Sequence, residues 1–316
     1  MTSLAGWLVR LLGLLIFVAA IGFGATKAPD RPLQTLVARW APPPSEFIDL
    51  NGQLVHLRDV GPRDDPQPIV LIHGTSASLH TWEGWVRRLE HQHRVITFDL
   101  PGFGLTGPSA AGDYSDEAYI AFVGALLDRL GLSRVTLGGN SLGGAIAWQF
   151  AAAQPARVGA LILVDAAGYA ATPSSIPLGF RLAGVPGLRH LSRFVLPRSV
   201  VERSVRNVFG NPSAVTPELV NRYYELTLRE GNRAALMQRI AQLKPGQFVD
   251  QLARLRVPTL ILWGEKDRLI PPENGSAFAR DIAGSQLVRF AELGHVPQEE
   301  DPAASVKPVE DFLHSL

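Results

Sequence analysis

One short motif limits the folds open to this chain more than any other feature. Residues 139–144 read Gly-Asn-Ser-Leu-Gly-Gly, the apolar run 134–138 comes directly before them, and residues 145–150 favour a helix. A strand, a tight turn and a helix in this order are the setting of a nucleophile elbow, which exposes the serine of Gly-x-Ser-x-Gly. We therefore predict that Ser141 is a nucleophile. The alternative is a glycine-rich turn in which Ser141 only caps the helix.

A serine hydroxyl becomes a good nucleophile only when a base takes its proton and an acid holds that base. The chain offers both downstream, because Asp267 follows the apolar run 259–263 and His295 follows the run 286–290. Catalytic groups gather at the carboxyl ends of parallel strands. We predict that His295 takes the proton of Ser141 and that Asp267 orients the imidazole.

Each of these two assignments has an alternative. Asp267 could be a turn residue, and the acid could instead be Glu265 or Asp165, which ends a strand of its own. His295 could be an ordinary loop histidine. Among the other seven histidines, only His73 has a similar position at the end of a strand.

A tetrahedral intermediate also needs two hydrogen-bond donors for its oxyanion. One is the backbone N–H of Leu142, the residue after the nucleophile, and the other comes from the loop after the third strand. We predict that Thr75 supplies the second N–H, and Ser76 is the second candidate for this role. We expect structural roles for His73, in the same loop, and for Asp99, which begins a rigid Asp-Leu-Pro-Gly-Phe-Gly turn.

The order of strands and helices predicts a parallel sheet covered on both faces. Asn51-Gly52 between two alternating runs signals a hairpin, and apolar strands then alternate with helices through residues 45–170 and 248–316. The segment 171–247 breaks this alternation, since it contains prolines, arginines and helical stretches but no buried strand. We interpret it as a helical cap, or lid, inserted over the carboxyl end of the sheet.

The first 44 residues differ in composition from the rest. Residues 1–26 are almost wholly apolar and predict a transmembrane anchor, with a cleaved signal peptide as the competing interpretation. Residues 27–44 hold a juxtamembrane amphipathic helix and a proline linker. The apolar stripe of that helix either lies at a membrane interface or packs on the catalytic domain; it consists of Leu33, Leu36, Val37 and Trp40.

Bulk composition excludes several function classes. The 316 residues carry a formal net charge of +1, so nothing points to nucleic acid. No cysteine is present, which excludes disulfides and thiol catalysis, and the eight histidines show no metal-ligand spacing. We expect no cofactor, because a serine mechanism needs none.

Taken together, the motifs resemble the α/β-hydrolase superfamily. The resemblance covers residues 47–316 and rests on His-Gly at 73–74, Asp-Leu-Pro-Gly-Phe-Gly at 99–104, the serine motif, Asp267 and Gly-His at 294–295. It implies an eight-stranded, mostly parallel sheet whose second strand is antiparallel. Serine at position 141 distinguishes the chain from haloalkane dehalogenases and epoxide hydrolases, which carry aspartate there. The apolar start, amphipathic helix and cap look similar to single-pass, membrane-anchored bacterial phospholipases A.

This resemblance implies a serine hydrolase that cleaves carboxylic esters of lipids through an acyl-enzyme, as phospholipases A, lysophospholipases and lipases do. The alternative is a carboxylesterase or carbon–carbon bond hydrolase for small soluble substrates, and a more remote one is a non-enzymatic binding protein. The expected partners are an acyl-chain substrate and a membrane. The resemblance also implies a single-pass inner-membrane protein with a periplasmic catalytic domain. Small residues in the apolar start leave a homodimer open.

Overall fold

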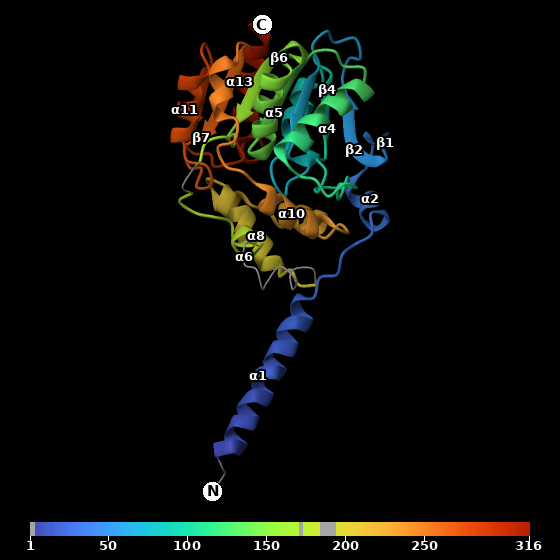
Figure 1. The fold of residues 1–316 in the computed structure, drawn as a ribbon, viewed down its shortest axis with the longest axis vertical. Coiled ribbons are helices and arrows are strands. Elements are labelled where there is room, and N and C mark those ends of the chain that lie inside the picture. Colours follow the sequence, from blue (N-terminus) through green and yellow to red (C-terminus); the bar gives the residue numbers. More distant parts are fainter. Residues whose placement is uncertain (1–3, 171–172, 184–193) are drawn as a thin grey trace.

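The computed structural model describes residues 4–170, 173–183 and 194–316 (Figure 1). Its centre is an eight-stranded sheet with the order β1-β2-β4-β3-β5-β6-β7-β8. β2 runs antiparallel to both β1 and β4, and all other neighbouring pairs are parallel, which confirms the expected eight-stranded, mostly parallel sheet of an α/β fold. The strands are β1 (Ser45–Leu50), β2 (Gln53–Val60), β3 (Ile69–Ile72), β4 (Val95–Phe98), β5 (Val135–Asn140), β6 (Val158–Val164), β7 (Thr259–Gly264) and β8 (Gln286–Phe290).

Local sequence accounts for the way these strands begin and pair. Asn51 and Gly52 both have positive φ angles, and Leu50 pairs directly with Gln53, so a two-residue turn closes the β1–β2 hairpin. Strands β3 to β7 are buried along their whole length. Continuous burial explains why these strands appear in the sequence as unbroken apolar runs.

Helices cover both faces of the sheet, and side chains of β3 alternate between the two resulting cores. Ile69 and Leu71 face α3 (Glu83–Leu89) and α13 (Pro302–His314), whose buried residues include Trp85 and Phe312. Val70 and Ile72 face the larger core on the opposite side. That core is packed by α4 (Asp116–Arg129), α5 (Leu142–Ala153) and α11 (Glu273–Asp281).

A group of helices from the segment 171–247, which the sequence analysis interprets as a cap, lies over one end of the sheet (Figure 1). Its described helices are α6 (Leu178–Ala183), α8 (Arg198–Val208), α9 (Pro217–Thr227) and α10 (Asn232–Gln242). Val201, Val205, Phe209 and Val220 form a small apolar core within it and contact Val296 of the catalytic domain. Residues 171–172 and 184–193 of the predicted cap lie outside the described residues.

The N-terminal helix α1 (Leu4–Thr26) extends away from the cap (Figure 1). Its side chains Trp7, Val9 and Phe17 are all more than half exposed. The sequence predicted that residues 1–26 span a membrane. Among residues 4–170, 173–183 and 194–316, no helix is both long and apolar enough to cross a bilayer, so the predicted span is not found there.

The segment between α1 and the sheet is hydrogen-bonded to the cap. The backbone N–H of Ala28 donates to Phe194 O at 2.8 Å, and Arg31 N donates to Leu228 O at 2.7 Å. Asp30 pairs with Arg233 of α10. This segment is therefore integrated with the folded domain.

Helix α2 (Gln34–Trp40) packs the predicted apolar stripe against the protein. Leu36 and Trp40 are buried in a cluster with Leu105 of the catalytic domain and Leu226 of α9. Trp40 Nε1 donates to Glu225 of α9 at 2.7 Å, while the carbonyl oxygen of Trp40 lies 2.7 Å from His80 Nε2. Of the two interpretations of this stripe, packing on the catalytic domain is the one observed. Trp40 thereby connects the cap to the loop after β3.

We expect Trp40→Ala to lower the free energy of unfolding by about 3 kcal/mol, because it removes a large buried side chain and leaves Glu225 without its indole donor. Urea denaturation of the full-length protein measures this difference. Trp7→Ala is the matched control, since Trp7 is 62% exposed on α1. Equal midpoints for the two variants would mean that Trp40 contributes nothing to cap docking.

Candidate active site

Ser141 lies in the sharp turn between β5 and α5. Its backbone angles, φ 55° and ψ −117°, fall in a region that non-glycine residues rarely adopt. Three backbone hydrogen bonds hold this conformation: Ser141 N donates to Val164 O, and Ser141 O accepts from Ala145 N and Ala167 N, at 3.0 to 3.1 Å. The geometry is that of the elbow predicted from the motif.

The glycines around Ser141 are needed for close approach of backbone to backbone. A Cβ atom on Gly139 would lie 2.2 Å from the carbonyl carbon of Gly143. A Cβ atom on Gly143 would lie 2.1 Å from the carbonyl oxygen of Ile72 in β3. Any side chain at these positions would separate the strand from the helix.

His295 and Asp267 form a buried hydrogen-bonded pair. His295 Nδ1 lies 2.6 Å from Asp267 Oδ2, and the two side chains are 5% and 0% exposed. Asp267 Oδ1 accepts backbone N–H groups from Leu269 and Ile270. Because a carboxylate only accepts, Nδ1 carries the proton, and Nε2 is left able to take one.

The two alternative acids occupy different surroundings. Glu265 is exposed and pairs with Arg289. Asp165 is fully buried at the end of β6, and its Oδ1 accepts the backbone N–H of Gly264 at 2.9 Å. The carboxylate hydrogen-bonded to His295 is thus that of Asp267, the residue chosen from the sequence.

Asn140 holds the loop that carries His295, a role that the sequence analysis missed. Its side-chain amide donates to His295 O at 2.9 Å and to Val164 O at 3.1 Å. His295 N in turn donates to Val208 O of the cap at 2.8 Å. The position of Asn140 inside the serine motif was the one signal available, because its partners are remote in the chain.

Ser141 and His295 open into a single cavity of about 530 Å³ beneath the cap. The loop after β3 forms one wall of this cavity with Gly74, Thr75 and Ser76. Apolar cap residues form the opposite wall; they include Phe180, Val195, Leu196, Val200, Val201, Val205, Leu236, Met237 and Leu243. A reactive group at Ser141 would therefore be surrounded mainly by hydrocarbon.

The predicted oxyanion donors belong to two different elements, helix α5 and the loop after β3. Leu142 is the first residue of α5, and the first N–H groups of a helix have no acceptor within the helix. Thr75 lines the cavity together with Ser141, and the neighbouring Ser76 has a positive φ of 60°. Backbone N–H groups from these two elements are suited to a negative charge that forms at the serine.

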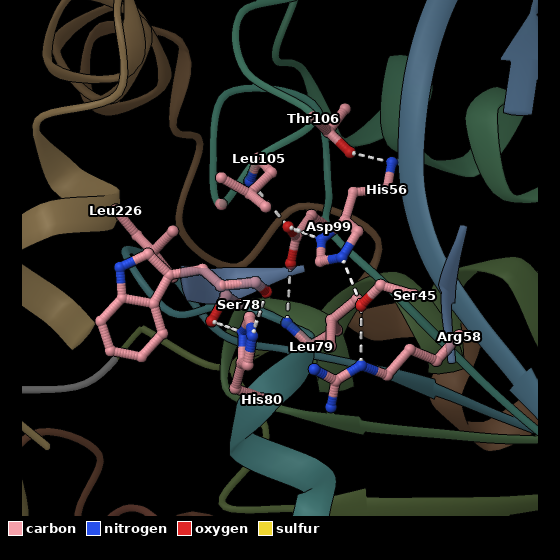
Figure 2. Close-up of polar contacts among 12 residues, drawn as sticks. Ser45, His56, Arg58, Ser78, Leu79, His80, Asp99, Leu105, Thr106 and Leu226 are labelled. Atoms are coloured by element: carbon pink, nitrogen blue, oxygen red, sulfur yellow. Dashed lines mark hydrogen bonds and ion pairs between the residues drawn. The ribbon is translucent and has the colours of Figure 1, made fainter. Parts of the chain in front are cut away.

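A buried polar network around Asp99 holds Leu79, which follows the loop after β3 (Figure 2). Asp99 accepts the backbone N–H groups of Leu79 and Leu105, both at 2.7 Å, and pairs with His56 Nδ1 at 2.7 Å. Burial alone would raise the pKa of the Asp99 carboxyl, but the charge and hydrogen bond of His56 hold this pKa below its ordinary value. Asp99 therefore acts as an ionised anchor for Leu79 and Leu105.

Two further histidines in this region are neutral hydrogen-bonding groups. Burial lowers the pKa of His73, whose Nε2 accepts the backbone N–H of Leu100 at 3.0 Å and whose Nδ1 lies 2.7 Å from Gly74 O. Burial also lowers the pKa of His80 to about 4. His80 bonds to Ser78 Oγ and Trp40 O, so it links α2 to the loop after β3.

Comparison with known proteins places this architecture among enzymes. Residues 67–302 match a protein family described as having the alpha/beta hydrolase fold. A 2-hydroxy-6-oxo-2,4-heptadienoate hydrolase of Pseudomonas putida is 34% identical over 273 residues, which cover 83% of this chain and 93% of that protein. Lipase 1 of Psychrobacter immobilis is 31% identical over 245 residues, 74% of this chain and 73% of that protein.

Solved structures show the same fold. The crystal structure of a membrane phospholipase A superimposes on this chain with a TM-score of 0.72 and 24% sequence identity. The superposition covers 99% of this chain and 96% of the phospholipase chain.

Proposed function

Because this chain belongs to the α/β-hydrolase family, we propose that it is a serine hydrolase that cleaves carboxylic esters of lipids, as phospholipases A, lysophospholipases and lipases do. In this proposal Ser141, His295 and Asp267 act as nucleophile, base and orienting acid. Their geometry supports it: the serine lies in a strained elbow, and it shares a cavity with a histidine whose Nδ1 is held by a carboxylate.

The proposed reaction proceeds in two steps. His295 Nε2 takes the Ser141 hydroxyl proton while Oγ attacks the ester carbonyl carbon, and the N–H groups of Leu142 and Thr75 stabilise the oxyanion. The intermediate collapses when the C–O bond to the alcohol breaks and His295 returns the proton to that oxygen. Water, deprotonated by His295, then attacks the acyl-enzyme and releases the carboxylic acid and free Ser141.

The single observation that favours an apolar acyl substrate is the composition of the cavity. Of the described residues that line it, only Arg233 and His295 are basic, and none is acidic. The Arg233 Nε donates to Asp30 at 3.1 Å, and its Nη2 donates to the Ala28 carbonyl at 2.8 Å. Pockets lined by hydrocarbon with few polar groups bind hydrocarbon ligands.

A carbon–carbon hydrolase is the rival proposal, supported by the 34% identity to the dienoate hydrolase. A dienoate carries a carboxylate, which needs a cationic partner when it is buried. In this chain the guanidinium of Arg233 already pairs with Asp30. The cavity therefore favours an uncharged acyl chain over an anionic substrate.

Purified full-length protein tests the two proposals directly. We expect hydrolysis of p-nitrophenyl acetate, butyrate, octanoate and laurate, with kcat/KM rising with chain length because each buried methylene adds about 0.8 kcal/mol of transfer free energy. We expect no cleavage of 2-hydroxy-6-oxo-2,4-heptadienoate. Efficient dienoate cleavage without ester hydrolysis would overturn the ester proposal.

Filling the cavity should change chain-length preference. Val200 lines the cavity from α8, and Val200→Trp should lower kcat/KM for laurate by at least about tenfold while changing that for acetate less than about threefold. Steady-state kinetics on the two esters measure the ratio of kcat/KM for laurate to kcat/KM for acetate. Leu54→Trp is the control, since Leu54 is 46% exposed on β2 and outside the cavity. Equal losses on both esters would place the acyl chain elsewhere.

We further propose that α1 attaches the protein to the periplasmic face of the inner membrane, next to its lipid substrate. The support is the exposed apolar surface of α1 and the likeness in fold, over 99% of the chain, to the membrane phospholipase A. Cell fractionation, protease treatment of spheroplasts and mass spectrometry of the mature N-terminus test this proposal. Recovery in the soluble fraction with a start near residue 23 would indicate a cleaved signal peptide.

A further inference from the structure

Asp165 is a buried carboxyl group that the proposed mechanism does not use. It directly follows β6 and has a positive φ of 42°, a conformation that is costly for a residue other than glycine. Its Oδ1 accepts the backbone N–H of Gly264, the last residue of β7. Its buried Oδ2 has no hydrogen-bond donor among the residues that the structure describes. A buried carboxyl oxygen without a donor is costly unless it carries or shares a proton.

The carboxyl group of Asp165 lies close to the hydrogen-bonded pair of Asp267 and His295. Three polar atoms, one from each of Asp165, Asp267 and His295, all lie within 4.8 Å of one another. All three side chains are buried. The cluster contains two carboxyl groups and one imidazole. Ionising both carboxyl groups of a close buried pair costs much more than ionising one, which favours a single proton held between them.

The surrounding hydrogen bonds decide which carboxyl group keeps that proton. Asp267 accepts two backbone N–H groups in addition to the bond with His295, whereas Asp165 accepts one. The other acidic group that affects Asp165 is Glu300, which accepts the N–H groups of Gly210 and Gly294. Burial, and then the charge of Asp267, raise the pKa of Asp165 well above its ordinary value. Asp165 is therefore the protonated member.

We propose that Asp165 is a reserve acid, a positioning residue that shares one proton with Asp267 and can supply the negative charge beside His295 when Asp267 cannot. This inference rests on the proposed function of Ser141 and His295. Replacing Asp267 by asparagine removes the second of the two main causes that keep Asp165 protonated, the neighbouring negative charge, and leaves burial as the first. Asp165 then releases its proton to solvent, and its carboxylate stabilises the imidazolium that forms when His295 takes the proton of Ser141.

The test compares Asp165→Asn, Asp267→Asn and the double variant in the full-length protein. In a serine triad with a single acid, the aspartate-to-asparagine change lowers kcat about 10⁴-fold. Here we expect Asp165→Asn to lower kcat for p-nitrophenyl butyrate about threefold, Asp267→Asn about 100-fold, and the double variant the full factor of about 10⁴. Equal kcat values for Asp267→Asn and the double variant would overturn the proposal.

The pH profile separates this role from a merely structural one. In Asp267→Asn, kcat should rise with pH as Asp165 ionises, and that rise should be missing from the double variant. Glu265→Gln is the matched control, because Glu265 is an exposed acid paired with Arg289 and should leave both kcat and its pH profile unchanged. Identical profiles for Asp267→Asn and the double variant would contradict the reserve role.

Labelling with a fluorophosphonate distinguishes failure of this inference from failure of the proposed function. Wild-type protein that neither labels at Ser141 nor hydrolyses esters would refute the serine mechanism itself. A labelled, active wild type with a 10⁴-fold loss in Asp267→Asn alone would refute only the reserve acid. Thermal denaturation confirms that each variant is folded. If Asp165→Asn does not fold, the single variant Asp267→Asn still decides between losses of about 100-fold and 10⁴-fold.

Discussion

Ser141→Ala should abolish ester hydrolysis, with a loss in kcat of about 10⁶ when the triad works as one unit. The reason is that alanine removes the atom that bonds to the acyl group, and neither His295 nor the oxyanion donors can replace it. Hydrolysis of p-nitrophenyl butyrate by purified protein measures the loss. The fluorophosphonate label should disappear at the same time.

The control for this result is a second serine in the same cavity. Ser204 lines the cavity from α8, and its hydroxyl donates to Val200 O within the helix. Ser204→Ala should therefore keep most of the hydrolysis and all of the labelling. Retained activity in Ser141→Ala, above the level of a mock purification, would show that another group is the nucleophile.

Gly143→Ala should destabilise the protein by about 4 kcal/mol, at the upper end of the range for single substitutions. The added Cβ would lie 2.1 Å from the carbonyl oxygen of Ile72, and backbone atoms cannot move aside as a flexible side chain can. Because α5 would shift away from β3, the elbow would also lose its geometry. Urea denaturation measures the free energy of unfolding. The rate of ester hydrolysis reports whether the elbow still holds Ser141 in its active geometry.

Gly124→Ala is the matched control for Gly143→Ala. Gly124 lies inside α4, and a Cβ atom there would meet its nearest neighbour, Gln154 Nε2, at 3.4 Å. Alanine favours a helix by up to about 1 kcal/mol over glycine, so this variant should be as stable as wild type or more stable. Similar stability for the two variants would mean that the close approach of α5 to β3 is not rigid.

Local chemistry explains what the sequence could predict. The Asn51-Gly52 turn, the apolar runs of the buried strands and the serine motif each act over a few residues, and the fold confirms the sheet they predict. The pair of Asp267 and His295 could be chosen because each follows a strand of a parallel sheet, and such strands end at one edge. The hydrogen bond between them is 2.6 Å long.

Contacts between distant segments could not be predicted in the same way. Nothing local to Trp40 indicates that its indole binds Glu225 or that its carbonyl oxygen meets His80. The proximity of Asp165 to Asp267 likewise depends on the pairing of β6 with β7. Mean apolarity of residues 1–26 predicted a membrane span, and the described residues contain no helix that meets the requirements for one.

The most direct test of lipid-ester hydrolysis is the release of fatty acid from intact glycerophospholipid by detergent-purified full-length protein, with Ser141→Ala alongside. Our account predicts release by the wild type and none by the variant, because the apolar cavity at Ser141 takes the acyl chain. Turnover of p-nitrophenyl acetate without any release from phospholipid, lysophospholipid or triglyceride would contradict it. The protein would then be a hydrolase of small soluble esters.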